Sequence, residues 1–160
     1  MKDFWGFGYY RDKDGILVRK ENNHGVITGP GVEIGRFSCV DKGSYRDTII
    51  EEGTKIDNLC HIAHNTIIGK HCLIVAGTIV GGSCEIGDYT YIGMNVSIKD
   101  HVKIGRHVIV GAGSVVINDI LDRDIVAGNP AKSIKSKVKL DDKARYNMVG
   151  YWCIPSKKYK

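Results

Sequence analysis

The chain has 160 residues, a formal net charge of +5 and 42% hydrophobic residues, with 20 Gly and 3 Pro. This size and composition suit one folded domain with its own core and argue against a disordered chain. No run of eighteen apolar residues occurs, so no membrane-spanning helix is expected. The modest positive charge suits a small anionic ligand rather than a nucleic acid, because the basic residues are scattered until residues 132–139.

The first 27 residues are predicted to form a capping segment. They are charged and aromatic and lack the apolar stretch of a signal peptide, so the protein is expected in the cytoplasm. Five cysteines, an odd number, argue against a fully paired disulfide framework. The aromatic residues of this segment are Phe4, Trp5, Phe7, Tyr9 and Tyr10. They are expected to cover the open end of the core, and stacking on a nucleotide base is the alternative.

A six-residue repeat dominates the chain from Ile50 onward. Twelve positions spaced by six are all Ile or Val: Ile50, Ile56, Ile62, Ile68, Ile74, Val80, Ile86, Ile92, Ile98, Ile104, Val110 and Val116. Four residues after each of them the side chain is mostly small: Thr54, Cys60, Thr66, Cys72, Thr78, Cys84, Thr90, Val96, Val102, Val108, Ser114 and Ile120. A helix repeats at 3.6 residues and a strand at 2, so neither explains a period of six. Hexapeptide repeats are typical of a parallel β-helix.

We therefore predict an all-β chain whose residues 28–121 form a parallel β-helix with three short faces per coil. Eighteen residues make one coil, and neighbouring coils stack at about 4.8 Å, the ordinary strand spacing. Thr28, Ile34 and Val40 continue the pattern toward the N-terminus. Between Val40 and Ile50 the spacing is ten residues instead of twelve, which indicates a loop or a shortened corner.

The segment CHIAHN, Cys60 to Asn65, places a thiol and two imidazoles within five positions. The repeat puts Cys60, Cys72 and Cys84 at inward small positions, which predicts core packing. No C-x2-C pair of the kind common in zinc sites occurs. His61 and His64 fall at outward positions, so both histidines lie outside the core.

The stretch KIDNLCHIAHNTIIGKHCLI, Lys55 to Ile74, resembles the left-handed β-helix acyltransferases, in particular the UDP-3-O-acyl-glucosamine N-acyltransferases of lipid A synthesis. The upstream segment DKGSYRDTII, Asp41 to Ile50, is similar to the same family. The resemblance covers roughly residues 34–116. It implies a left-handed β-helix and a homotrimer with its sites between neighbouring subunits.

The resemblance also implies catalytic roles. His64 corresponds to the general base, Asn58 to the Asn of the IDN motif, and His101 to a second histidine near the substrate. The residue one coil beyond the base, Gly82, would donate its backbone N–H to the reacting carbonyl oxygen. The chemistry suits these residue types, since an imidazole with a pKa of about 6.5 accepts a proton at neutral pH and a fixed N–H stabilises an oxyanion. A surface histidine without a role is the alternative for His64.

The string VAGNPAK, Val126 to Lys132, is very similar to a segment that closes the β-helix in many acetyl-CoA-dependent acetyltransferases. By this resemblance we assign Gly111, Ala112, Asn129, Pro130 and Lys132 to the coenzyme site, within a C-terminal part, residues 122–160, that holds a coenzyme-proximal loop and a tail. An Asn-Pro turn that simply ends the domain is the alternative. The lipid A enzymes use an acyl carrier protein and have an N-terminal sugar-binding domain, whereas only about 27 residues precede these coils. Acetyl-CoA is therefore the expected donor.

The sequence thus predicts a cytoplasmic homotrimeric acetyltransferase that acetylates the amino group of a nucleotide-linked amino sugar, without a metal and without a membrane or nucleic-acid partner. Transfer to a sugar hydroxyl is the nearest alternative. A gamma-type carbonic anhydrase would need a histidine where Gly69 stands. A non-catalytic β-helix scaffold is the third alternative. From Asp141 onward a short helix capped by Asp141 is expected.

Overall fold

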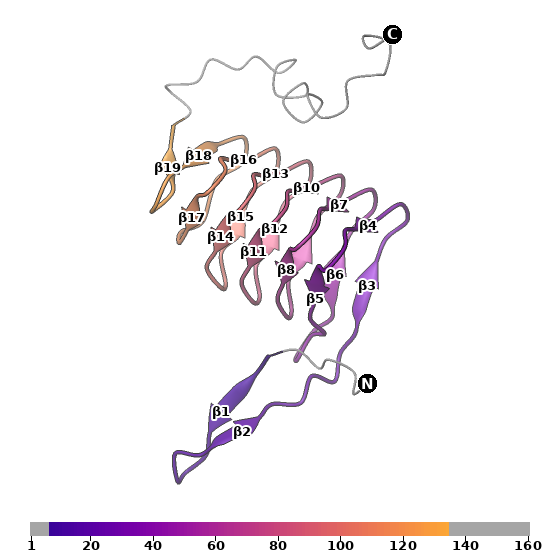
Figure 1. Cartoon of the computed structure of the whole chain (residues 1–160), viewed down its shortest axis with the longest axis vertical. Helices are drawn as coiled ribbons and strands as arrows, with labels where there is room; N and C mark the ends of the chain where they lie inside the picture. The colour runs from indigo at the N-terminus through magenta and orange to yellow at the C-terminus, as the bar shows by residue number, and fades with distance from the viewer. Residues whose placement is uncertain (1–6, 135–160) are drawn as a thin grey trace.

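The computed structural model describes residues 7–134. An antiparallel hairpin of β1 (Tyr9–Arg11) and β2 (Leu17–Arg19) comes first and extends away from the stacked coils (Figure 1). All other strands belong to three sheets that form the faces of a prism. The helix expected after Asp141 and the residues Phe4 and Trp5 lie outside the described part of the chain. No helix capable of crossing a lipid bilayer occurs in residues 7–134.

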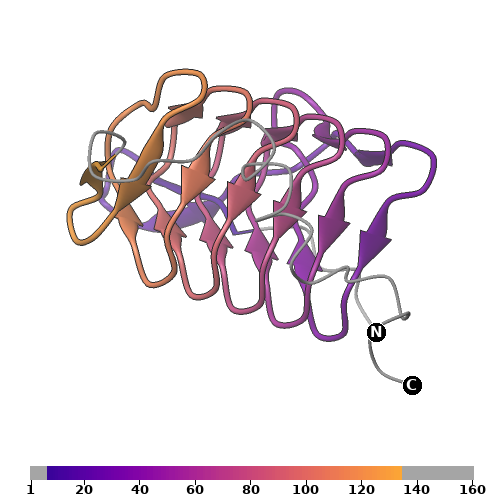
Figure 2. The same ribbon diagram turned by 90° about the horizontal axis from the view of Figure 1, so that it is seen from above.

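The three sheets are built almost entirely from parallel two-residue strands, and successive coils lie side by side along the prism (Figure 2). The first sheet contains β3 (Val26–Thr28), β6 (Thr48–Ile50), β9 (Ile67–Ile68), β12 (Glu85–Ile86) and β15 (Lys103–Ile104). The second contains β5 (Cys39–Val40), β8 (His61–Ile62), β11 (Ile79–Val80), β14 (Ser97–Ile98) and β17 (Val115–Val116). The third contains β4 (Glu33–Ile34), β7 (Lys55–Ile56), β10 (Leu73–Ile74), β13 (Tyr91–Ile92), β16 (Ile109–Val110), β18 (Ile125–Ala127) and β19 (Lys132–Ser133).

The register confirms the hexad pattern. Residues eighteen apart are partners on neighbouring strands, as in Ile56↔Ile74↔Ile92. All twelve predicted anchors are at most 3% exposed and form one continuous core cluster. Burial of this column of branched side chains, at about 25 cal/mol per Å² of apolar surface, is the main stabilising term of the prism.

The small inward positions are hydrogen-bonding sites as well as space fillers. The Thr54 hydroxyl donates to the Gly69 carbonyl at 2.7 Å, and Thr78 donates to Gly93 at 2.9 Å, in each case fifteen residues ahead. Cys72 makes the same contact to the Gly87 carbonyl at 3.2 Å through its thiol. Where the small residue is Thr or Cys it therefore also donates a hydrogen bond, whereas Val96, Val102 and Val108 fill the same place by apolar packing.

The break in spacing after Val40 is a loop and not a shortened corner. In the first coil Val40 pairs with Ile62, and Thr28 pairs with Ile50, so partners are twenty-two residues apart. The four additional residues lie in the connection between β5 and β6. This connection, residues 41–47, is called the first-coil loop below.

The ends of the prism differ from the expected boundaries. At the C-terminal end, β18 pairs with β16 in parallel, so the coils extend beyond residue 121. At the N-terminal end, Phe7, Tyr9 and Tyr10 are all exposed, so these aromatic residues do not cover the core. Tyr9 and Tyr10 belong to β1 of the hairpin, and the Phe7 ring packs edge-on against Tyr9. Ile34 of the first coil is 42% exposed, which leaves that end of the core partly open in the described chain.

Candidate functional site

His64 lies on the turn between β8 and β9, at an edge of the prism formed by the stacked turns 63–66, 81–84 and 99–102. This edge is called the His64 corner. The imidazole lies directly over Gly82 of the next coil. A β-carbon added to Gly82 would be 2.7 Å from His64 Cε1 and 3.0 Å from Nε2. Gly82 is therefore required for space, and it brings its backbone against the imidazole.

The backbone N–H of Gly82 is buried and has no acceptor in residues 7–134. The equivalent N–H in three other turns is bound by an Asn or Asp side chain of the next coil: Arg36 by Asn58, Lys70 by Asp88, and Arg106 by Asp122. The N–H groups of Ala76 and Met94 also have no acceptor among the described residues, but Ala76 is half-buried and Met94 is exposed, whereas Gly82 is buried. A free buried donor is costly unless something else binds it. Beside an imidazole, this N–H is suited to stabilise a developing oxyanion.

His101 lies one coil beyond Gly82 at the same corner. Its backbone N–H donates to the Gly82 carbonyl at 2.9 Å. Its side chain is 71% exposed, and Nε2 is 3.8 Å from the Asp100 carboxylate. The fold thus brings together three residues predicted for the site, with His64 and His101 two coils apart, or about 10 Å along the axis.

The first-coil loop lies beside this corner and is held by Asn65. The Asn65 side chain is fully buried, and its Oδ1 accepts the N–H groups of Ser44 at 2.7 Å and Tyr45 at 3.2 Å. The Tyr45 hydroxyl is 2.9 Å from Ser83 Oγ, and the Ser83 N–H donates to the His64 carbonyl at 2.8 Å. No role for Asn65, Tyr45 or Ser83 was predicted from the sequence. The ten-residue spacing after Val40 was the available signal.

His61 points outward from β8 beside the carboxylate of Asp41. His61 Nε2 is 3.7 Å from Asp41 Oδ2, which is too long for a hydrogen bond. Asp41 Oδ2 is buried and has no hydrogen-bond partner among the described residues. His61 is therefore placed to pair with Asp41 and not to contact Gly82.

The structure places Asn58 elsewhere. It lies at the edge formed by turns 57–60, 75–78, 93–96 and 111–114, called the Asn58 corner, one face of the prism away from His64. Its Oδ1 accepts the Arg36 N–H at 2.7 Å, the capping contact described above. A cleft of about 630 Å³ lies beside this corner, lined by residues that include Asp57, Leu59 and Met94.

The predicted coenzyme residues lie toward the C-terminal end. Gly111 and Ala112 belong to the Asn58 corner. Asn129 and Pro130, joined by a cis peptide bond, form the turn between β18 and β19. The turn is fixed to the last coil, because the Ala131 N–H donates to Val115 and the Gly128 N–H donates to the Ser114 hydroxyl. Lys132 is exposed.

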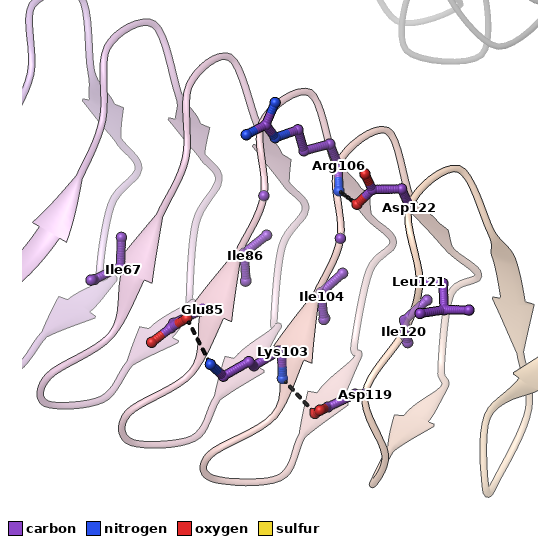
Figure 3. A pocket seen from close by; sticks show the side chains of 12 residues that line it. Ile67, Glu85, Ile86, Lys103, Ile104, Arg106, Asp119, Ile120, Leu121 and Asp122 are labelled. Carbon is purple, nitrogen blue, oxygen red and sulfur yellow. Dashed lines mark hydrogen bonds and ion pairs between the residues drawn. The ribbon is translucent and has the colours of Figure 1, made fainter.

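A second cleft, of about 770 Å³, lies on the face that contains β9, β12 and β15 (Figure 3). Lys103 pairs with Glu85 across this cleft at 3.4 Å. Glu85 also contacts Arg46 of the first-coil loop at 3.3 Å. The cleft therefore begins beside the first-coil loop and its charged groups are largely paired.

The three buried cysteines are unsuited to chemistry. Burial raises the pKa of Cys72 and Cys84 to about 11, and burial also raises the pKa of Cys60. All three thiols therefore stay protonated at neutral pH, whereas nucleophilic attack and metal binding need the thiolate. The core-packing prediction is confirmed by their burial at 2% exposure or less. Within residues 7–134 no three His, Cys, Asp or Glu side chains are grouped to hold a metal ion.

The comparisons with known proteins concern the repeat and the fold. Residues 47–82 and 83–118 match the family described as bacterial transferase hexapeptide (six repeats). A probable UDP-3-O-acylglucosamine N-acyltransferase 2, mitochondrial, of Arabidopsis thaliana is 54% identical over 65 residues, which are 41% of this chain and 21% of that protein. The chain therefore spans about a fifth of the length of the curated relatives it matches.

Two solved structures are similar in fold. An Arabidopsis UDP-N-acetylglucosamine acyltransferase superposes with a TM-score of 0.70 at 22% identity, over 89% of this chain and 52% of that one. The acetyltransferase domain of PglB from Neisseria gonorrhoeae FA1090 gives a TM-score of 0.55 at 26% identity, over 68% of this chain and 54% of that one. The left-handed parallel β-helix is thereby confirmed as the class of fold.

Proposed function

We propose that the chain transfers an acyl group from a thioester to the amino group of a nucleotide-linked amino sugar, with His64 as the general base. The observation that carries this proposal is the His64 imidazole in contact with Gly82, whose buried N–H is free. The relatives are named as UDP-3-O-acylglucosamine N-acyltransferases, which supports a nucleotide-linked amino sugar as the acceptor.

The His64 corner suits each step of this reaction. As the acceptor nitrogen forms its bond to the thioester carbon, His64 takes the proton from the nitrogen. The carbonyl oxygen becomes an oxyanion and accepts the Gly82 N–H. The carbon–sulfur bond then breaks, and the leaving thiolate takes the proton back from His64. An amide and a free thiol result, and His64 is regenerated.

We further propose acetyl-CoA as the donor. The turn with Asn129 and Pro130 is fixed on the last coil, and the exposed Lys132 is suited to bind an anionic phosphate there. The fold similarity to an acetyltransferase domain supports the same donor. Acetyl-CoA and long-chain acyl thioesters of CoA and of acyl carrier protein should be compared directly. If only the long-chain donors are turned over, acetyl-CoA is refuted as the donor, but the proposed acyl transfer still stands.

We propose a homotrimer with each site between two chains. In one chain the predicted residues are divided between the His64 corner and the Asn58 corner, so a second chain is needed to bring the two groups together. Light scattering tests the trimer. Co-expressed His64→Ala and Asn58→Ala chains, each inactive alone, should regain partial activity in mixed trimers, because some interfaces then keep both residues. An active Asn58→Ala homotrimer would reduce Asn58 to its capping contact.

The general base is tested by measuring thiol release from acetyl-CoA with a panel of nucleotide-linked amino sugars. His64→Ala should lose turnover, whereas His61→Ala, whose imidazole faces Asp41, should keep it. An amino sugar and its hydroxyl analogue compared as acceptors separate N-transfer from O-transfer. Full turnover in His64→Ala would refute the proposal.

A further inference from the structure

The first-coil loop distinguishes the His64 corner from the other corners of the prism. Four residues are added to the chain between β5 and β6, and the spacing between partners returns to eighteen residues in the next coils, before it shortens to sixteen in the last coil. The added residues lie in the first coil, next to the second-coil turn that carries His64. An insertion at the edge of a regular repeat is placed where it alters the binding surface.

The loop is rigid. Asn65 binds the backbone N–H groups of Ser44 and Tyr45 from the coil side. From the other side, the His24 N–H donates to the Gly43 carbonyl at 3.1 Å, and the Gly25 N–H donates to Asp47 at 2.6 Å. A loop held from both sides acts as a fixed wall.

Tyr45 is the residue that this wall presents to the corner. Its backbone is bound by Asn65, and its hydroxyl is 2.9 Å from Ser83, the residue after Gly82. The side chain therefore extends across the coil of Asn65 toward the free N–H. Even so, Tyr45 is 55% exposed. An aromatic ring that is fixed at both ends and still exposed offers a preorganised, low-entropy surface for a ligand.

We propose that Tyr45 is an acceptor-binding and specificity-determining residue, whose ring packs against the apolar face of the sugar that carries the reacting nitrogen. This inference rests on the proposed function. The part of an acceptor that lies nearest His64 and Gly82 is the sugar ring itself, and the nucleotide lies farther away. The C–H face of a pyranose matches an aromatic face, as the polar handle of the tyrosine is already bound to Ser83.

The test compares three variants by steady-state kinetics with acceptor and donor varied separately. Tyr45→Ala should raise the KM for the acceptor about tenfold or more and leave the KM for the donor unchanged. Tyr45→Phe keeps the ring and the bond from the backbone to Asn65, so its acceptor KM should stay within about threefold of the wild-type value. Tyr89→Ala removes another exposed tyrosine, which is stacked between His71 and His107 at a different corner, and should change neither KM.

Two results would overturn the inference. An unchanged acceptor KM in Tyr45→Ala shows that the ring does not contact the acceptor. Equal losses in Tyr45→Phe and Tyr45→Ala, with parallel drops in Tm, show that Tyr45 is only a strut held through its hydroxyl. If the wild-type protein turns over no acceptor, the proposed function fails, and calorimetry with UDP-glucosamine decides the inference: weaker binding to Tyr45→Ala than to wild type supports it, and equal or absent binding overturns it.

Discussion

Replacing Gly82 with alanine tests the geometry on which the proposed mechanism depends. The new β-carbon would lie 2.7 Å from His64 Cε1, whereas an ordinary contact is at least 3.4 Å, so the ring must move by about 0.7 Å. Displacements of about 1 Å at a reacting group cost on the order of 100-fold in rate. We therefore expect kcat to fall roughly 10- to 100-fold. The obstructing atoms belong to a half-buried side chain that has room to move, so the free energy of unfolding should change by about 1 kcal/mol or less.

Thiol release measures kcat, and thermal denaturation measures the stability of the same preparations. Gly81→Ala is the matched control for folding, because its β-carbon would meet backbone atoms, Asp100 N at 2.5 Å and Ile98 O at 2.8 Å. The Gly81→Ala variant should lose roughly 1–3 kcal/mol of unfolding free energy. Gly8→Ala meets nothing closer than 3.6 Å and should be neutral. Wild-type kcat in Gly82→Ala, or a loss explained entirely by unfolding, would contradict the role of the His64–Gly82 contact.

Three further predictions concern stability and the coenzyme. Burial raises the pKa of the Cys72 and Cys84 thiols from 9.0 in the unfolded chain to about 11 in the folded chain. The free energy that these protonated thiols contribute to the folded state is therefore fully present below pH 9 and is lost as the pH rises to 11. The loss should be on the order of 2 kcal/mol of unfolding free energy per thiol. Replacing both cysteines with Thr, which occupies the same position in other coils, should flatten the pH dependence of the unfolding free energy measured by denaturant titration. An unchanged pH dependence in this variant would count against the prediction. Asn65→Ala should lower the free energy of unfolding by roughly 2–4 kcal/mol, because two N–H groups lose their acceptor and the residue has a positive φ of 60°. Asn65→Asp keeps the acceptor oxygen and should lose less stability. Equal Tm values for the two variants would contradict this prediction. Lys132→Ala should raise the KM for acetyl-CoA about tenfold through the lost phosphate contact, and an unaltered KM would remove Lys132 from the coenzyme site.

The parts of the fold that were predictable from sequence depend on one repeated local requirement. Every anchor from Ile50 to Val116 meets the same environment, so the period of six alone identifies the buried column. Once the inward direction is known, the burial of Cys60, Cys72 and Cys84 and the outward direction of His61 and His64 follow. The resemblance then identified His64 and Gly82, which the structure brings into contact.

Other parts depended on contacts between distant residues. The ten residues from Val40 to Ile50 can be read as two hexads that lack two residues or as one hexad with four residues added. Only the pairing of Val40 with Ile62 shows that four residues are added. The aromatic residues of the N-terminus were expected at the open end of the core, but Tyr9 pairs with Arg19 in a separate hairpin.

The sequence by itself determined the repeat, the inward and outward direction of each side chain, and the residue types available at each turn, because a side chain's direction is set by its place within a single hexad. The tertiary structure decided which turns lie on one edge, that the His64 ring lies against Gly82, and that the first-coil loop presents Tyr45 beside them. These relations join residues eighteen to thirty-eight positions apart, and their distances depend on the number of residues in each coil, which pairing between strands fixes.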